Sequence, residues 1–407
     1  MKITGVDIYH VRLANPPQRN WFPTCIRIST DEGICGWGEA GIPIKAGKEA
    51  IGHYIAELSG MIVGMDPMDN EKIWNMLYSN SYWTYGGGAL NFAAISSIDM
   101  ALWDIKGKAL GVPVYKLLGG KTNDALRSYA SQTQLGWGAC RRISVTPDEY
   151  AENAMEAVKQ GFTAIKVDPF WTDDEGKAAS ANREAVPPEK RSDWTWTGFA
   201  RGDQLTSVSN RVGAIRDAVG DKVDIVIEFH GIMDVNTSIQ VGRELDQYKC
   251  LYYEEPGSSV NPRTTLEFKR GVHTPVATGE RIGSTWGFRR LVEDRAIDVA
   301  QPDLGIIGGF TEMKKMCDFA NLHSVGIQIH NMGGPIQCAA TLHVETAIPN
   351  FVIHEHLSWN ELEAFRRLGK YDYQPTNGKL QVPEIPGIGQ ELSEEAIAQS
   401  EILHVGG

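Results

Sequence analysis

The stretch VDIVIEFH, residues 223–230, decides the fold, because the chain repeats its form at a fixed distance. It is a short apolar run that leads into an acidic residue, and two later runs follow the same plan: CLYYEEP (250–256) and TPVATGE (274–280). Their acidic residues lie at equal intervals of 26 residues: Glu228, Glu254 and Glu280. A strand, a helix and two connections fill such an interval, so the repeat predicts β/α units and a parallel sheet.

Three further runs continue the pattern toward the C-terminus: AIDVAQPD (296–303), GIQIH (326–330) and NFVIHEH (350–356). They bring Asp303, His330 and Glu355 to strand ends. We expect eight strands in all, near 127–133, 162–167, 223–229, 250–254, 275–279, 297–301, 326–329 and 351–354. Eight parallel strands close a barrel, so the predicted fold class is α/β, an eight-stranded, TIM-like (β/α)-barrel.

The pattern before residue 125 is different. Residues 1–42 alternate as antiparallel strands do, and the segment 93–111 carries apolar residues at steps of three and four, as on one face of a helix. A barrel uses roughly 250 residues, so a chain of 407 residues has room for a second module. The expected parts are an N-terminal α+β domain over 1–124, the barrel over 125–370, and a segment over 371–407 that returns to the N-terminal domain.

The composition excludes several classes of partner. A formal net charge of −12 argues against nucleic acid and against an anionic membrane. The N-terminus lacks the apolar core of a signal peptide, and no apolar stretch approaches the length that spans a bilayer. The six cysteines form no CxxC pair. We therefore expect a cytoplasmic enzyme with reduced thiols.

The three equally spaced glutamates predict a metal site. Side chains at the C-terminal ends of barrel strands converge on one mouth, and three carboxylates in one place need a cation between them. Hard oxygen ligands suit Mg²⁺. A single glutamate at a strand end is more often a surface charge, but three at equal spacing favour metal ligation. The spacing does not decide whether Glu254 or its neighbour Glu255 points inward.

Two histidines are in phase with these acids. His330 ends the seventh strand beside Asp303 on the sixth, and an Asp bonded to one imidazole nitrogen raises the basicity of the other. Because side chains alternate along a strand, His230 shares a face with Glu228, and it would lie opposite His330 in the barrel wall. We therefore expect two proton-transfer groups on either side of a substrate. The alternative for His330 is a core histidine with a structural partner.

The connection after the second strand is unusually long. Lys166 and Asp168 share a face at the end of that strand, and residues 169–203 separate it from a helix that begins near Gln204. This insertion is rich in charge and carries three tryptophans: Trp171, Trp194 and Trp196. Loops of this length are usually functional or disordered. A lid over the barrel mouth and a solvated insertion that makes subunit contacts both agree with the sequence.

The chain resembles the enolase superfamily in its mandelate-racemase-like subgroup, and is most similar to the sugar-acid dehydratases there. The resemblance covers essentially the whole sequence. It rests on SSIDMALWDIKGKALGVPVYKLLGG (96–120), KVD (166–168), EFHG (228–231), YYEEP (252–256), TGER (278–281), QPDLGIIGG (301–309), IHNMGGP (329–335) and HEHL (354–357). It implies that the N-terminal domain caps the barrel mouth and that the protein forms homo-oligomers.

The resemblance also implies a mechanism. The Mg²⁺ ligands would be Glu228, Glu254 and Glu280. The His330–Asp303 dyad would abstract the proton α to a carboxylate, His230 would protonate the departing 3-hydroxyl, and Glu355 would hydrogen-bond the substrate carboxylate. The expected reaction converts a sugar acid, an aldonate such as galactonate, gluconate or mannonate, to a 2-keto-3-deoxy acid. Epimerisation or cycloisomerisation of a sugar acid, or a catalytically idle homologue that only binds one, are the alternatives.

Two departures from the family pattern bear on this mechanism. The racemases of the subgroup carry Lys-x-Lys on the second strand, and here Lys166 matches the first lysine while Asp168 replaces the second. A two-base racemase is therefore disfavoured. Glu228 stands where many relatives have Asp, a longer side chain that would shift the metal.

The remaining predictions concern the substrate. The substrate-binding candidates are Lys166, Asp168, Arg281, Trp21 and Arg19. Arg281 could pair with a substrate carboxylate or with a neighbouring acid. Trp21 and Arg19 could cover the mouth from the capping domain, or they could be ordinary core and surface residues.

Overall fold

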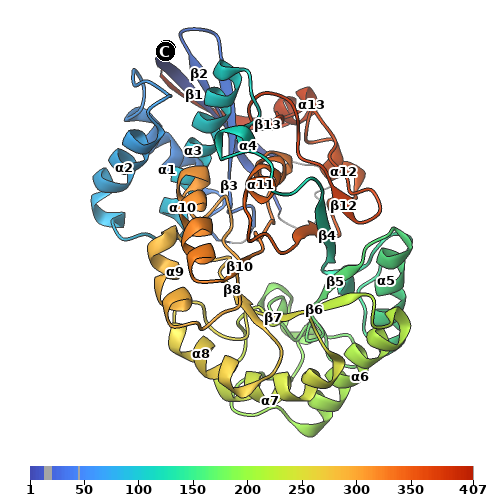
Figure 1. Ribbon diagram of the computed structural model, residues 1–407. Coiled ribbons are helices and arrows are strands. Elements are labelled where there is room, and N and C mark those ends of the chain that lie inside the picture. The colour runs from blue at the N-terminus through green and yellow to red at the C-terminus, as the bar shows by residue number, and fades with distance from the viewer. Residues whose placement is uncertain (13–20, 45, 407) are drawn as a thin grey trace.

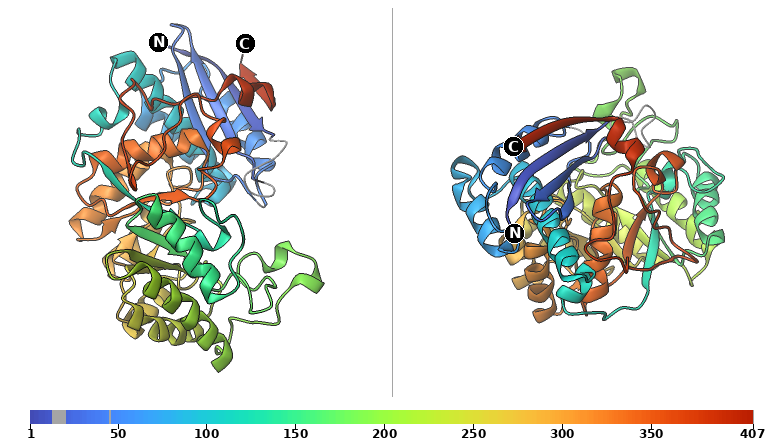
Figure 2. Two further views of the ribbon diagram at one scale, coloured as in Figure 1. Left: turned by 90° about the vertical axis from the view of Figure 1, so that its right-hand side faces the viewer. Right: turned by 90° about the horizontal axis from the view of Figure 1, so that it is seen from above.

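The computed structural model describes residues 1–12, 21–44 and 46–406 of the chain. Its N-terminal part is built on an antiparallel sheet in the order β13 (Ser400–Gly406), β1 (Ile3–Val11), β2 (Thr24–Thr30), β3 (Cys35–Ala40). The last strand of the chain lies beside the first, with Gly406 opposite Gly5 and Ser400 opposite Val11. Figure 2 shows the two ends of the chain together in this sheet.

The helices of the N-terminal part are α1 (Ala50–Gly60), α2 (Asn70–Asn80), α3 (Ala89–Leu110) and α4 (Val114–Leu117). Helix α3 is buried on most of its surface because it lies between this sheet and the barrel. Its close approach to β3 requires glycine, since a Cβ on Gly38 would stand 1.9 Å from the carbonyl oxygen of Ser97. The sequence GWG of β3 therefore determines how α3 packs.

Eight parallel strands form the barrel, in the order β10 (Gly326–Ile327), β9 (Val299–Ala300), β8 (Val276–Thr278), β7 (Tyr252–Glu254), β6 (Asp224–Glu228), β5 (Ala164–Val167), β4 (Leu126–Ser131), β11 (His354–Leu357). The two ends of this order are joined through Ile327, which donates its N–H to Asn350 O and accepts from Val352 N, each at 2.8 Å. A short strand, β12 (Lys379–Leu380), pairs antiparallel with β4. The predicted α/β barrel with an N-terminal α+β capping domain is confirmed.

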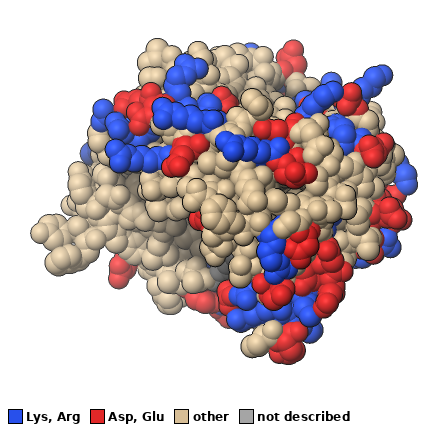
Figure 3. Space-filling model, turned by 90° about the horizontal axis from the view of Figure 1, so that it is seen from below, with Lys and Arg blue, Asp and Glu red and all other residues tan. Residues whose placement is uncertain are grey.

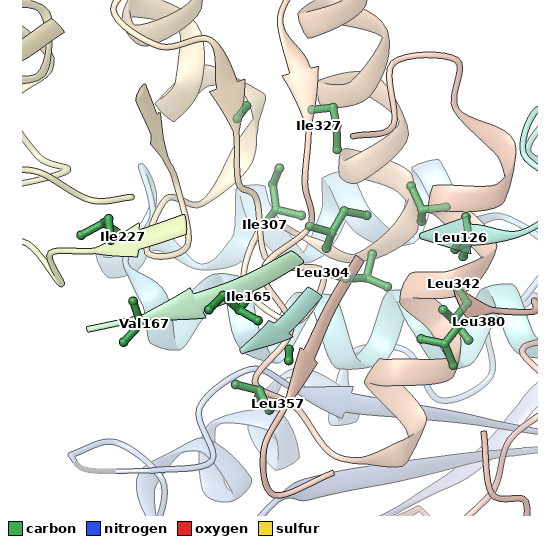
Figure 4. Packing of buried hydrophobic residues seen from close by; sticks show 14 of the residues in the cluster. Leu126, Ile165, Val167, Ile227, Leu304, Ile307, Ile327, Leu342, Leu357 and Leu380 are labelled. Carbon is green, nitrogen blue, oxygen red and sulfur yellow. The ribbon is translucent and has the colours of Figure 1, made fainter. Parts of the chain in front are cut away.

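The helices that cover the barrel are α5 (Pro147–Lys159), α6 (Gly202–Val219), α7 (Val235–Leu245), α8 (Pro262–Gly271), α9 (Ser284–Glu293), α10 (Gly309–Leu322) and α11 (Pro335–Ala347), and two short helices follow, α12 (Glu363–Arg366) and α13 (Glu394–Ala398). Figure 4 shows apolar side chains of the strands and helices packed together between these layers. Ile165 and Val167 of β5 are fully buried there. Because side chains alternate along a strand, Lys166 between them faces the barrel interior.

The eighth strand differs from its predicted position. The apolar run at 351–354 was expected to form it, but regular pairing with β4 covers His354–Leu357, where His354 lies opposite Ser128. Residues 350–352 instead make the bonds to Ile327 that join the barrel ends. Burial of His354 in the wall is possible because its Nδ1 lies 2.7 Å from the carboxylate of Glu345 on α11. Glu355 is therefore inside the strand and not beyond its end.

The capping domain supplies the N-terminal caps of helix α10. Asp99 on α3 accepts hydrogen bonds from Thr311 N at 2.9 Å and from Thr311 Oγ1 at 2.5 Å. Ser96, one turn earlier, accepts from Gly308 N at 2.9 Å and Gly309 N at 3.0 Å. The first N–H groups of a helix have no partner within it, so these bonds fix where α10 begins.

Helix α11 is capped in the same way by β3. Glu39 is fully buried and accepts hydrogen bonds from Gly334 N and, at 3.0 Å, from Gln337 N. Helices α10 and α11 follow the strands that lead to Asp303 and His330. The capping domain thus holds both loops that carry the predicted dyad.

The buried carboxylate of Asp99 makes this interface sensitive to pH. Burial raises the pKa of Asp99 to about 7, whereas an unfolded Asp has a pKa of about 3.9. Its contribution to the free energy of unfolding is therefore complete below about pH 4 and is lost as the pH rises through 7. In Asp99→Asn, which can keep both bonds to Thr311, the loss of stability between pH 5 and pH 8 should shrink by about 2 kcal/mol.

Urea unfolding at the two pH values measures this effect. Ser96→Ala is the matched control, because it removes a capping bond from the same loop without removing a titrating group. It should lower stability by the same amount at both pH values. If Asp99→Asn kept the pH dependence of the wild type, the protonation of Asp99 would not be linked to folding.

No helix within the described ranges is long and apolar enough to cross a membrane. On the face that Figure 3 shows, Lys and Arg side chains are interspersed with Asp and Glu. The six cysteines are all free.

Candidate active site

Three carboxylates from neighbouring strands meet at the mouth of the barrel. Glu228 ends β6 and Glu254 ends β7, and their backbones are paired in register, which places the two side chains next to each other. Glu280 follows the end of β8 by two residues. One oxygen of each carboxylate lies within 4.8 Å of the others. The sequence repeat therefore predicted a real cluster.

The neighbouring Glu255 points elsewhere. Its φ of 45° lies in the left-handed region, and its carboxylate accepts a hydrogen bond from Arg281 Nη2 at 2.7 Å. Arg281 Nε also donates to Glu280 Oε1 at 3.1 Å. Of the two adjacent glutamates, which the sequence could not separate, it is Glu254 that joins the cluster.

The donor set of this cluster fits a divalent cation. Glu254 Oε2 is buried and has no hydrogen-bond partner among the described residues. Lys166 Nζ lies 2.6 Å from Glu254, 2.7 Å from Glu355 and 3.2 Å from Glu228. One ammonium group shared by three buried carboxylates leaves negative charge uncompensated, which is costly in an interior. Carboxylate oxygens are the ligands that Mg²⁺ and Ca²⁺ prefer.

The protonation of these acids reflects the same crowding. Burial, and after it the charge of Glu228, raises the pKa of Glu254 well above its usual range. For Glu280, burial also favours the neutral acid, but the neighbouring His330 and Arg281 outweigh it and lower the pKa to about 2. Carboxylates forced together in this way are stabilised by an added positive charge.

His330 and Asp303 form a hydrogen-bonded dyad at the same mouth. His330 Nδ1 lies 2.7 Å from Asp303 Oδ2, and its Nε2 lies 3.3 Å from Glu280 Oε2. Burial disfavours the imidazolium, but the charge of Glu280 and the bond to Asp303 outweigh it and raise the pKa of His330 to about 10. The nitrogen that is not bonded to Asp303, Nε2, thus points toward the carboxylate cluster.

Two donors hold the other oxygen of Asp303. Gly305 N and Gln337 Nε2 donate to Asp303 Oδ1 at 2.7 and 2.9 Å. Asp303 therefore cannot rotate without breaking two bonds, and the bond from its Oδ2 to the imidazole fixes the tautomer of the ring.

His230 forms a second dyad, with Asp168. His230 Nδ1 lies 2.8 Å from Asp168 Oδ2, and the His230 N–H donates to Glu228 Oε1 at 2.8 Å. Burial disfavours the imidazolium, but Glu228 and Asp168 together raise the pKa of His230 to about 9. The prediction that strand alternation turns His230 toward the mouth was wrong in its reason, because β6 ends at Glu228. His230 reaches the mouth by a left-handed turn, with φ 52°, followed by Gly231 at φ 63°.

Comparisons with known proteins agree with this geometry. A family model described as "Enolase C-terminal domain-like" matches residues 149–396, and one described as "Mandelate racemase / muconate lactonizing enzyme, N-terminal domain" matches residues 20–119. The chain belongs to the enolase superfamily. The predicted membership of its mandelate-racemase subgroup is confirmed.

Several relatives in this superfamily carry dehydratase names. The chain is 32% identical over 406 residues to the D-galactonate dehydratase of Pectobacterium atrosepticum and 31% identical over 406 residues to that of Ralstonia pickettii, in each case over 98% of this chain and 94% of the relative. Among solved structures, a member of the enolase superfamily from Salmonella Typhimurium is 44% identical, with a TM-score of 0.93 over 99% of both chains. Dehydratases are thus established as homologues of this chain over its full length.

Glu355 completes the set of acids in this enolase-superfamily barrel. Its Oε1 accepts from Ser131 Oγ at 2.7 Å, and its Oε2 accepts from Asn331 N at 3.0 Å. Burial favours the neutral acid, but Lys166 and His330 outweigh it and lower the pKa of Glu355 to about 2. The carboxylate is therefore charged and fixed in place.

The structure places the predicted substrate-binding residues unevenly. Lys166 and Asp168 both lie in the site. The lysine contacts Glu228, Glu254 and Glu355, and the aspartate contacts His230 and Ser180. Arg281 pairs with Glu255 and Glu280, the neighbouring-acid alternative. Trp21 is fully buried and donates its indole N–H to Met332 O at 3.2 Å, so it holds the loop after His330 from within the core. Arg19 lies outside the described residues.

Sequence reasoning missed several residues that support the site, among them Ser131, Asn331 and Gln337. Ser131 ends β4, so the position itself, at the mouth end of a barrel strand, was a signal. Asn331 follows His330 and acts through its backbone N–H, which no side-chain pattern reveals. Gln337 lies on α11, and only the packing of that helix brings its amide to Asp303.

Proposed function

We propose that the protein is a Mg²⁺-dependent dehydratase of a sugar acid, and that its substrate is an aldonate such as galactonate, gluconate or mannonate. The supporting observation is that two histidine–aspartate dyads, through His330 and His230, adjoin one cluster of three glutamates. A dehydration needs a base at one carbon, an acid at the next carbon and positive charge at the carboxylate. The dehydratase names of the full-length relatives support the same reaction class.

Glu228, Glu254 and Glu280 would hold the metal ion. Bound there, Mg²⁺ supplies positive charge where negative charge develops on the substrate carboxylate, which makes the α-proton removable by a weak base. Glu355 and Lys166 then orient the carboxylate of the substrate from the barrel interior.

His330 and His230 move the two protons. His330 Nε2 takes the proton from C2 of the substrate, while Asp303 keeps the opposite nitrogen protonated and the ring in place. His230 gives its proton to the 3-hydroxyl as the C3–O bond breaks, so that water leaves. The resulting enol tautomerises to the 2-keto-3-deoxy acid. Because the acid and the base belong to separate walls of the barrel, we expect anti elimination.

The carboxylates of the site favour the protonated form of both histidines. The pKa of His330 is about 10 and that of His230 about 9 because the surrounding carboxylates are uncompensated. Glu280 lies against His330 Nε2. A cation that neutralises the charge of Glu280 would lower the pKa of His330 toward neutrality, where a general base is most effective.

A screen of acid sugars tests the proposal. The purified full-length protein with Mg²⁺ is incubated with a library of aldonates and aldarates, and 2-keto-3-deoxy acids are detected with semicarbazide. We expect at least one aldonate to give the keto product, and EDTA to abolish the reaction. An epimerised or lactonised product would show the epimerase or cycloisomerase alternative instead. Binding of an aldonate without any product or C2–hydrogen exchange would show the catalytically idle alternative.

A further inference from the structure

The insertion 169–203 is an ordered part of the barrel mouth. Thr172 and Ala178 form a bridge, and Ala178 forms another with Arg191. The fully buried guanidinium of Arg211 on α6 donates to the carbonyls of Pro169 and Thr172 at 2.8 and 2.7 Å. The inner part of the insertion is therefore tied to the barrel.

The outer part of the same insertion projects from the molecule. The left-hand view of Figure 2 shows this light green segment extending away from the barrel. Two tryptophans of the insertion are buried in its inner part. Trp194 and Trp196 are 6% and 4% exposed, and Trp196 Nε1 donates to Ala179 O at 3.2 Å. Trp194 and Trp196 thus form a core for the inner turn of the insertion.

That inner turn returns the chain to Asp168. Ser180 Oγ donates to Asp168 Oδ2 at 2.7 Å, and Phe170 N donates to Asp168 Oδ1 at 2.8 Å. Asp168 is fully buried, and its Oδ2 is the oxygen that meets His230 Nδ1 at 2.8 Å. The ring of Trp171 lies 6.2 Å from the ring of His230. The insertion therefore covers one side of the second dyad.

We propose that Asp168 and Ser180 are positioning residues for His230, and that the insertion exists to build this second dyad. The proposal rests on the function proposed above, in which His230 protonates the leaving hydroxyl. Asp168 does not touch the substrate in this account. Asp168 stands where the racemases carry their second lysine, and it acts through the neighbouring His230.

The physical reason lies in the two nitrogens of the imidazole. A carboxylate at Nδ1 requires the proton to be there, so Nε2 is the nitrogen that delivers the second proton toward the site. His230 also has a left-handed φ of 52°, which is unfavourable for a residue with a side chain and persists only when its surroundings hold it. The bond to Asp168 and the hydroxyl of Ser180 behind it supply that restraint.

The first experiment separates positioning from general damage. With the aldonate found in the screen, Asp168→Asn should reduce dehydration by about 10²–10⁴-fold, because the amide can hold the wrong tautomer. Exchange of the C2 hydrogen with solvent, which depends on His330, should persist. Ser180→Ala should lower kcat for dehydration in the same direction by a smaller factor, with exchange again retained.

Ser192→Ala is the matched control for Ser180→Ala. Ser192 is another buried serine of the insertion, and its hydroxyl accepts from Trp194 N at 3.0 Å without contacting Asp168. It should leave the ratio of exchange to dehydration unchanged. The proposal is overturned if Asp168→Asn and Ser180→Ala lower exchange and dehydration equally, or if Ser192→Ala changes the ratio as Ser180→Ala does.

A second measurement does not depend on the proposed function. In protein labelled with ¹⁵N-histidine and loaded with Mg²⁺, we expect a ring N–H resonance far downfield that is absent in His230→Asn. It should also vanish in Asp168→Asn and shift in Ser180→Ala. If no such resonance depends on Asp168, the dyad is not formed and the proposal fails, whatever the enzyme assays give. If it is formed but no sugar acid reacts, only the proposed function fails.

Discussion

Replacing His330 by Asn should abolish both C2–hydrogen exchange and dehydration. The imidazole Nε2 is the group that takes the C2 proton in the proposed reaction, and it lies 3.3 Å from Glu280 Oε2 at the carboxylate cluster. General base catalysis contributes about 10²–10⁴-fold, and we expect a loss at the upper end of that range. The measurement is NMR of the substrate in D₂O, which follows the C2 hydrogen and the keto product together.

His230→Asn is the control for this prediction. It removes a histidine of the opposite dyad and should lose dehydration while exchange at C2 continues. The Mg²⁺ affinity of both variants should stay close to that of the wild type, since neither histidine is one of the three carboxylates. Continued exchange in His330→Asn at the wild-type rate would remove His330 from the role of base.

Glu254→Gln should also inactivate the enzyme, but through the metal ion. The substitution keeps the shape of the side chain and removes one negative charge and one anionic oxygen from the cluster. Glu254 Oε2 is a buried oxygen of the cluster that has no hydrogen-bond partner among the described residues, so its replacement by an amide should weaken Mg²⁺ binding strongly. We expect turnover at ordinary Mg²⁺ concentrations to fall by at least about 10³-fold, as expected when an electrophilic stabiliser is lost.

Substitution of the neighbouring Glu255 provides the matched control. Glu255 is equally buried and adjacent in sequence, but it pairs with Arg281 and lies outside the cluster. Glu255→Gln should bind Mg²⁺ as the wild type does, although loss of its ion pair should lower stability. If both variants lost the metal ion equally, the assignment of Glu254 as the ligand would be wrong.

Much of the site could be predicted because residues that recur once per β/α unit come close together at the mouth of a barrel. The equal intervals between Glu228, Glu254 and Glu280 placed three carboxylates at one mouth, and they do meet there. The partnership of His330 with Asp303 followed in the same way from neighbouring strands. These residues lie at or within three positions of strand ends, where the direction of the strand still determines the position of the side chain.

Residues whose position depends on loops could not be predicted. Asp168 was predicted to bind substrate, whereas its carboxylate contacts His230 and Ser180. Ser180 returns to the site only through the turn of the insertion, and no periodicity describes such a turn. Glu255 and His230 both have left-handed backbones, so strand alternation is not a valid guide beyond Glu254 and Glu228.

The eighth strand shows a further limit of sequence patterns. Apolar residues at 351–353 suggested the strand, but the paired segment is His354–Leu357. A barrel wall near an active site is polar on its inner face, so hydrophobicity marks the buried run before the strand and not the strand itself. The contact between His354 and Glu345 satisfies a buried polar group that composition alone would place at the surface.

The account depends most on one divalent cation bound by Glu228, Glu254 and Glu280, and calorimetric titration of metal-free protein with Mg²⁺ tests it directly. We predict one Mg²⁺ per chain for the wild type and for Glu255→Gln, and little or no binding for Glu254→Gln. Equal binding by the wild type and Glu254→Gln, or no binding by the wild type, would contradict the account.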